Sequence, residues 1–161
     1  MNAQTGAGTA AFAGGNLKAI VTSSASGAGS PANLQSYPVV AGTVPAVASG
    51  VHFLAWGVAA NNANAKTVSV TFAGTTLITQ GLQASVNDTW ALEGWILDAS
   101  ATSANSIANG LTNGTTAKTV TSQLGFAVTW ANANTLQVSC TQVAAGDVTE
   151  QGLIVDYIRG Q

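Results

Sequence analysis

The sequence contains few charged side chains. Asp, Glu, Lys and Arg make up 6% of its 161 residues, against about a quarter in an ordinary globular domain. The four basic residues are scattered along the chain, whereas binding to a phosphate backbone requires a cluster of positive side chains. We therefore expect no nucleic-acid partner. Because so little charge gives weak protection against association, we also expect much of the surface to be covered within an assembly.

Long apolar runs and cysteine pairs are missing as well. A membrane helix needs about 20 consecutive apolar residues, and the longest apolar stretch, 51–60, is interrupted by His52 and Gly57. We therefore expect no membrane partner. The single Cys140 excludes an internal disulfide, and no basic and apolar leader follows Met1. These features predict synthesis and folding in a reducing cytoplasm.

The residues that carry chemistry are equally scarce. With one His, one Cys and six acidic residues, the sequence has no metal-binding spacing and no glycine-rich phosphate loop in a strand–turn–helix context. A Cys140–His52 pair lacks any supporting motif, and a calcium site at Asp147 and Glu150 competes with a simple role in surface solubility. We expect no catalytic, cofactor-binding or metal-binding residues, no cofactor, and no enzymatic activity.

What the sequence does contain is a period-two alternation of apolar and polar residues, which is typical of β-strands. Turn residues separate the alternating segments, and no segment has a sustained helical period. Pro38 marks the first segment as an edge strand, the stretch 99–114 reads as a polar loop, and Leu124, Phe126, Val128 and Trp130 fall on one face of their segment. The alternating segments are 34–40, 51–59, 66–73, 76–79, 88–98, 115–122, 124–130, 135–143 and 148–159. We expect these nine segments to form about eight strands of the fold. This pattern predicts an all-β antiparallel sandwich of jelly-roll type.

The first 33 residues differ in composition from the rest. Gly, Ala, Ser and Thr dominate residues 1–33, whereas the sandwich occupies 34–161. Such a segment buries too little apolar area to order itself, so it is either a flexible terminus or an arm lying extended across a neighbouring subunit. If it is an arm, its contacts fall in the one short apolar stretch, at Leu17, Ile20 and Val21.

Two predicted strands, 51–59 and 148–159, are apolar on both faces, whereas a simple sandwich strand has one wet face. We favour a subunit interface as the explanation, and the alternative is that both strands lie centrally beneath loops. Trp90 and Trp130 align with the core side of their strands, whereas Trp56 and Trp95 fall on the opposite side. The interface candidates are Leu54, Trp56, Val58, Trp95, Leu153, Val155 and Tyr157.

Several short motifs follow one another between residues 34 and 159. A strand ends in a Trp-Gly pair, passes an Ala/Asn turn, and enters a Lys-Thr-Val strand that leads into a Phe-x-Gly-Thr hairpin. They are Trp56-Gly57, 59–65, Lys66-Thr67-Val68, Phe72-Ala-Gly-Thr75, Trp90-x-Leu92-Glu93 and Glu150-Gln-Gly152-Leu-Ile-Val155. This combination resembles the jelly-roll virion proteins of tailed bacteriophages, with the N-terminal arm outside the resemblance.

The resemblance implies a structural role in a phage particle. Such proteins are trimeric capsid decoration or cement proteins, or parts of head and tail fibres. Because the chain has no shaft repeats, we expect a cement protein that forms a homotrimer, binds the major capsid protein or another virion protein, and lies on the capsid surface after synthesis in the bacterial cytoplasm. The alternative is a fibre module that binds carbohydrate or a receptor on the host surface through Trp56 or Trp95.

Overall fold

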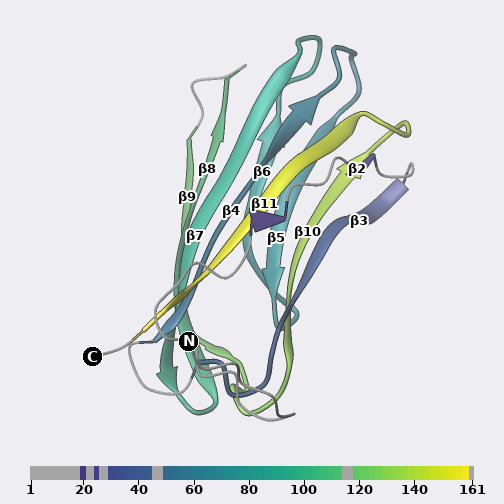
Figure 1. Ribbon diagram of the computed structural model, residues 1–161. Helices are drawn as coiled ribbons and strands as arrows, with labels where there is room; N and C mark the ends of the chain where they lie inside the picture. The colour runs from purple at the N-terminus through teal and green to yellow at the C-terminus, as the bar shows by residue number, and fades with distance from the viewer. Residues whose placement is uncertain (1–18, 21–23, 26–28, 45–48, 114–117, 160–161) are drawn as a thin grey trace.

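The computed structural model describes residues 19–20, 24–25, 29–44, 49–113 and 118–159, and all regular structure in these ranges is β-strand (Figure 1). The strands form two antiparallel sheets, which confirms the predicted all-β sandwich. The large sheet has the order β1 (Ala19–Ile20), β11 (Val148–Ile158), β4 (Gly50–Ala59), β7 (Asp88–Ser100), β8 (Ser103–Thr112) and β9 (Thr119–Ala127), with β2 (Ser24–Ala25) also paired to β11. The small sheet has the order β3 (Gly29–Val39), β10 (Asn134–Gln142), β5 (Lys66–Phe72) and β6 (Thr75–Leu82). Within the described ranges, no helix is long and apolar enough to cross a membrane.

The strands pair as one long antiparallel ribbon that is folded over on itself. The β5–β6 hairpin forms the tip, and the pairs β4–β7, β3–β10 and finally β1 and β2 with β11 follow it. Successive pairs lie in alternate sheets. Within the large sheet, β11 pairs with β4, and within the small sheet, β10 pairs with β5, so each sheet contains two of these pairs side by side. This winding is that of a jelly roll, as the sequence pattern predicts.

The tip of the ribbon is a two-residue turn. Ala73 and Gly74 both have positive φ, at 49° and 81°, as the central residues of a type I′ hairpin turn require. Their geometry matches the right-handed twist of the flanking strands, so this turn sets the pairing of Phe72 with Thr75 and of Thr71 with Thr76, after which the register shifts at Val70.

Alternation along the strands fills the space between the sheets. Val51, Phe53 and Ala55 of β4 are fully buried, whereas their neighbours Leu54 and Trp56 are half-buried on the outer side. The predicted core positions of Trp90 and Trp130 and the inward side of Cys140 are likewise confirmed. The remaining large side chains that are most deeply buried include Phe72, Leu77, Ile78, Leu92, Ile96 and Leu136.

The stretch predicted as a polar loop, 99–114, contains the strand β8 instead. Its core-facing residues are small, so Ala104 and Ala108 fill the inner side, while the larger Ile107 and Leu111 face outward. The usual pattern of large residues inside and polar ones outside is therefore reversed, which explains why the prediction was wrong. Together with β9, this strand extends the large sheet beyond β7.

Strand β9 combines two segments that were predicted separately, and it corrects the placement of Leu124. The register between β8 and β9 shifts between Ala104 and Ser106, opposite Gly125. Gly125 has a φ of +64°, and its N–H donates to Asn105 Oδ1 over 2.9 Å. Leu124 is consequently 82% exposed, although Phe126 remains in the core. Thr121 Oγ1 donates to the Leu77 carbonyl of β6 over 2.6 Å, so β9 also closes this side of the sandwich.

A second irregularity changes the orientation of β11. The register against β4 shifts between Glu150 and Gly152, and a one-residue shift moves every later side chain to the other face. Leu153 and Val155 are therefore fully buried in the core and cannot form a subunit interface. This corrects two of the predicted interface positions.

Tyr157 also lies on the inner side, where it packs against the core. Burial, with a smaller contribution from the neighbouring Tyr157 hydroxyl, raises the pKa of Tyr37 on the opposite sheet to about 12. Tyr157 is therefore partly buried between the two sheets, and its predicted role in an interface stays a prediction.

The beginning of the sandwich lies earlier in the chain than residue 34. Strand β3 begins at Gly29, and β1 and β2 pair with β11 from within the segment that was read as an arm. Ile20 lies in β1 opposite Leu153, whereas the other two predicted arm contacts, Leu17 and Val21, lie outside the described residues. The edge position that Pro38 predicted for β3 is confirmed.

Asp147 holds together the loops at one end of the sandwich. Its carboxylate accepts hydrogen bonds from the side chains of Asn62 and Asn64, over 2.6 and 2.8 Å, and from the Ala144 N–H over 2.9 Å. These bonds, the Ala144 N–H foremost, hold the pKa of Asp147 below its usual value. The Ala/Asn turn is therefore fixed by a buried carboxylate, and the surface role predicted for Asp147 is wrong.

Glu150 lies inside the sandwich with no hydrogen-bond partner. Its side chain is 1% exposed, and both carboxyl oxygens are buried and unsatisfied. Because burial disfavours the charged form, the pKa of Glu150 is raised to about 8. The surface role predicted for this residue is wrong too, since the protein holds it as a neutral acid.

Glu150 predicts a loss of stability at alkaline pH. The unfolded chain ionises this carboxyl near pH 4.5, whereas the folded protein keeps it protonated up to about pH 8. Its contribution to the free energy of unfolding is fully present below pH 4.5 and falls by about 3 to 5 kcal/mol as the pH rises to 8. Urea unfolding at pH 5 and pH 8 measures this loss. Between these pH values, we expect the free energy of unfolding of Glu150→Gln to fall by about 3 to 5 kcal/mol less than that of the wild type. Gln151→Glu, which places a carboxyl on the exposed neighbour, should keep the wild-type pH dependence, and an equal loss in wild type and Glu150→Gln would contradict the assignment.

Candidate functional site

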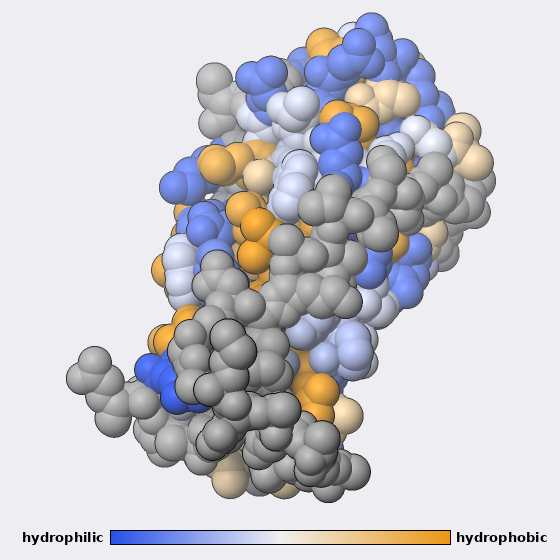
Figure 2. Space-filling view, viewed as in Figure 1, coloured by the Kyte–Doolittle hydropathy of each residue, from blue (hydrophilic) through white to orange (hydrophobic). Residues whose placement is uncertain are grey.

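The outer face of the large sheet carries most of the exposed apolar side chains. Five of the seven large hydrophobic residues that are exposed lie on β7, β8 and β9, and we call them the outer patch. Figure 2, seen from the same side as Figure 1, shows apolar residues among polar ones on this side of the molecule. Isolated apolar residues are common on surfaces, but a contiguous group marks an interaction site. The outer patch comprises Leu97, Ile107, Leu111, Val120 and Leu124.

A polar cluster borders the outer patch on the neighbouring strands. His52 of β4 contacts Glu93 of β7 through Nε2, at 3.0 Å from Oε1, and Asp156 of β11 through Nδ1, at 3.4 Å from Oδ2. The ring of Trp95 lies against the imidazole, with 5.0 Å between the ring centroids. Trp95 is also the cross-strand partner of Ile107, so the cluster and the patch form one continuous surface.

Trp56 lies on the same outer face, over the bulge in β11. A Cβ atom added to Gly152 would come within 2.2 Å of Trp56 Cζ2, which shows that the indole packs directly on the glycine backbone. The half-buried Leu54 and Val58 flank Trp56 along β4. Strand β11 contributes Ile154, which pairs with Leu54, in place of the buried Leu153.

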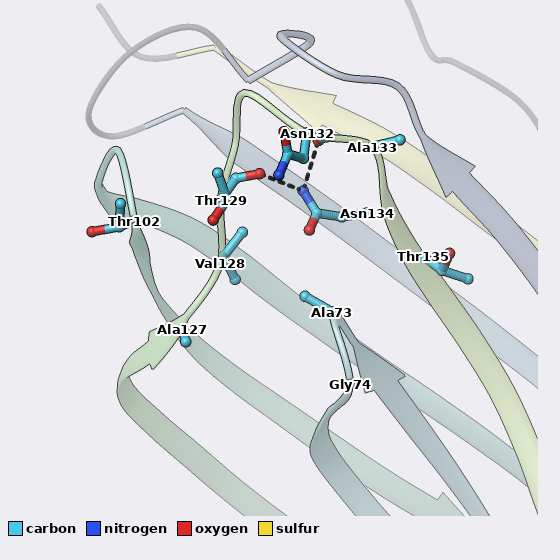
Figure 3. Close-up of a pocket in the computed structure, with 10 residues that line it drawn as sticks. All are labelled: Ala73, Gly74, Thr102, Ala127, Val128, Thr129, Asn132, Ala133, Asn134 and Thr135. Carbon is cyan, nitrogen blue, oxygen red and sulfur yellow. Dashed lines mark hydrogen bonds between the residues drawn. The ribbon is translucent and has the colours of Figure 1, made fainter.

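A separate hollow of about 610 Å³ lies at the turn between β5 and β6 (Figure 3). Its side chains are alanine, threonine, valine and asparagine, with no ionisable group among them. The Asn134 amide donates to the carbonyls of Thr129 and Asn132, over 3.2 and 3.1 Å, so its donors are engaged within the loop. The hollow therefore offers neither a nucleophile with a base nor a charged binding group.

The predicted alternatives of a Cys140–His52 pair and a metal site can be compared with the described residues. Cys140 is buried in the core, whereas His52 lies on the outer face. In the ranges covered by the structure, no group of three His, Cys, Asp or Glu residues could hold a metal ion. What the arrangement can do is bind, through apolar contacts and a small charged cluster.

Of the seven predicted interface residues, the structure places four together on the outer face: Leu54, Trp56, Val58 and Trp95. The outer patch itself was missed, because β8 was read as a loop. One signal was available: in β8 the residues at even positions are all small, whereas the large Ile107 and Leu111 both fall at odd positions. Such an alternation predicts a strand whose small residues face the core and whose large apolar residues face away from it.

No family model matches this sequence, and no curated protein matches it. Among solved structures, the chain is similar to a chain in the structure of the Gt strain of infectious bursal disease virus, at 12% identity and with a TM-score of 0.33. The match covers 90% of this chain and 32% of the other, so the protein spans about a third of the matched chain. We base the fold on strand connectivity and the function on the side chains of the outer face.

The contact between Trp56 and Gly152 can be tested directly. In Gly152→Ala the added methyl group displaces the indole from the sheet, and overpacking of this kind costs about 1 to 3 kcal/mol. We expect a lower urea midpoint and a tryptophan emission maximum shifted to longer wavelength. Gly81→Ala is the matched control, because a Cβ at Gly81 has no neighbour within 4 Å. Identical behaviour of the two variants would show that Trp56 does not rest on Gly152.

Proposed function

We propose that this protein is a non-enzymatic structural component of a virus particle, and that it associates through the outer face of its large sheet. The finer proposal is a phage capsid decoration or cement protein on the capsid surface, as the resemblance of its motifs implies. The observation that carries the proposal is the concentration of exposed apolar residues on β7, β8 and β9. A protein that binds only the assembled shell stabilises it by mass action, in proportion to the number of sites occupied.

The size of the outer face fits a protein partner. Five strands at about 4.8 Å spacing and roughly 30 Å of strand length give a face of about 700 Å². Stable protein interfaces bury roughly 600 to 1,000 Å² on each partner, so the area of this face lies within the range of one interface. A flat apolar sheet suits another flat protein surface better than a small ligand, which needs a concave site.

A second copy of the same chain is the partner that we propose for this face. The outer patch lies on β7 to β9, whereas His52 and Asp156 lie on β4 and β11, and Glu93 lies on β7 at the border of the patch. The copies can bury their patches while the carboxylates remain hydrated at this border, which is the usual division of an interface into apolar core and polar rim. The resemblance implies a homotrimer, in which the three patches would meet around a three-fold axis, because patch-to-patch pairing of two copies alone closes a dimer.

Self-association can be tested with a charge placed in the outer patch. We expect Ile107→Asp to raise the dissociation constant of the oligomer about ten- to a hundredfold, because it buries an unpaired charge at the interface centre. Sedimentation velocity over a range of concentrations measures this change, and the urea midpoint should stay near that of the wild type, since Ile107 is 47% exposed. Thr141→Asp, on the exposed side of the small sheet, is the control and should associate normally.

Two results would contradict this proposal. A wild-type protein that stays monomeric at all concentrations has no self-association to explain, which would favour an interface formed only on a shell. If Ile107→Asp associates as well as the wild type, the oligomer uses another surface.

The second candidate is a fibre module that binds carbohydrate. The half-buried Trp95, which lies against the cluster of His52 and its two carboxylates, favours it, as does the half-buried Trp56 farther along β4. Sugars stack on aromatic rings, and carboxylates accept hydrogen bonds from their hydroxyl groups. This alternative predicts binding on a glycan array that Trp95→Ala abolishes and that Ile107→Asp leaves intact. Retained binding in Trp95→Ala would exclude this site.

A further inference from the structure

The contacts of His52 depend on its protonation state. Each ring nitrogen faces a carboxylate oxygen, Glu93 Oε1 on one side and Asp156 Oδ2 on the other. An ionised carboxylate only accepts hydrogen bonds, and a neutral imidazole carries one N–H donor and one acceptor nitrogen. Both contacts are hydrogen bonds only when the ring is the doubly protonated imidazolium. In the neutral ring, one nitrogen lone pair faces a carboxylate lone pair, so that contact must open.

The shorter contact indicates which nitrogen keeps the proton. Nε2 lies 3.0 Å from Glu93, whereas Nδ1 lies 3.4 Å from Asp156. We expect the neutral ring to retain Nε2–H and to release Asp156. The Oδ1 atom of Asp156 is buried without a hydrogen-bond partner. When the contact of Oδ2 with His52 opens, the carboxylate therefore loses the side-chain hydrogen bond that orients it.

No other charge in the described part of the chain compensates this cluster. Strand β7 presents Glu93 and the neutral Trp95, and β11 presents Asp156, all around the His52 ring of β4. On the outer side of β8 the polar groups are the neutral Asn105 and Asn109, and on β9 the neutral Ser122. The described cations Arg159 and Lys118 lie outside the strands, after β11 and before β9, and Lys66 donates to loop carbonyls.

We propose that His52 is a proton-controlled clamp that joins β7, β4 and β11 and regulates docking on the outer face. This inference rests on the proposed function, because the face that it regulates is the one we assign to self-association. With the proton bound, the cluster has one net negative charge and both ring nitrogens of His52 donate hydrogen bonds. Without the proton, it has two negative charges beside the patch, and like charges on facing copies repel. Histidine commonly serves as a pH sensor in proteins, and here docking strengthens when the ring takes up its second proton.

The state of the ring can be read without any association. His52 is the only histidine in the chain, so its ¹⁵N resonances in the labelled full-length protein need no further assignment. We expect both ring nitrogens to be protonated at pH 5.5 and the Nε2–H tautomer alone at pH 8.5. A ring whose neutral form carries its proton on Nδ1, or a ring that stays neutral at pH 5.5, would overturn the clamp.

Asp156→Asn is the variant that separates the clamp from general effects of pH. The asparagine side chain can donate to the neutral Nδ1, so both contacts of His52 survive deprotonation. By sedimentation velocity at constant ionic strength, we expect the wild-type dissociation constant to rise about three- to tenfold from pH 5.5 to 8.5, as expected for rim charges. The dissociation constant of Asp156→Asn should rise by a smaller factor, because its cluster passes only from neutral to one negative charge and keeps both contacts of His52. Equal pH dependence in the two proteins overturns the regulation. Absence of association at every pH instead overturns the proposed function, while the ¹⁵N spectra still decide whether the clamp exists.

Discussion

The pairing of β4 with β11 is the contact on which the rest of the structure depends. It joins the early part of the chain to its end, and it places β11 between β4 and the short strands β1 and β2. Without it the large sheet would separate into β4 with β7 to β9 on one side and the C-terminal strand on the other. The ladder also sets the orientation of β11, because its bulge at Glu150 and Gly152 decides which side chains enter the core.

The same ladder creates the candidate site. His52 and Asp156 are 104 positions apart in sequence, yet they are cross-strand partners in β4 and β11. Glu93 reaches the ring from the other neighbouring strand, 41 positions away. A cluster assembled from three strands is held by the backbone ladders on both sides, so its geometry is as stable as the sheet. A binding surface on such a sheet needs little ordering when a partner arrives, which keeps the entropic cost of association low.

The protein keeps its core and its binding face separate by the choice of side chains in β8. Small residues on the inner side let this strand lie close to the core, while the larger residues are left on the outside. That reversal leaves the large apolar side chains of β8 outside the core. The association that we propose would bury them. The scarcity of charge in the sequence agrees with this role, since a surface that is covered needs less charge for solubility.

The sequence by itself determined the features that follow from local alternation: the all-β class, the inner and outer sides of β4, β5 and β10, the burial of Trp90 and Trp130, and the edge position of the proline-containing β3. These follow because a strand alternates its side chains with a period of two wherever its register is unbroken. Only the tertiary structure decided the outward position of Leu124, the burial of Leu153 and Glu150, and the meeting of His52 with its two carboxylates. Bulges change the period at a single residue, and cross-strand neighbours depend on how strands pair over long distances in sequence. Neither is recorded in the local pattern of residues.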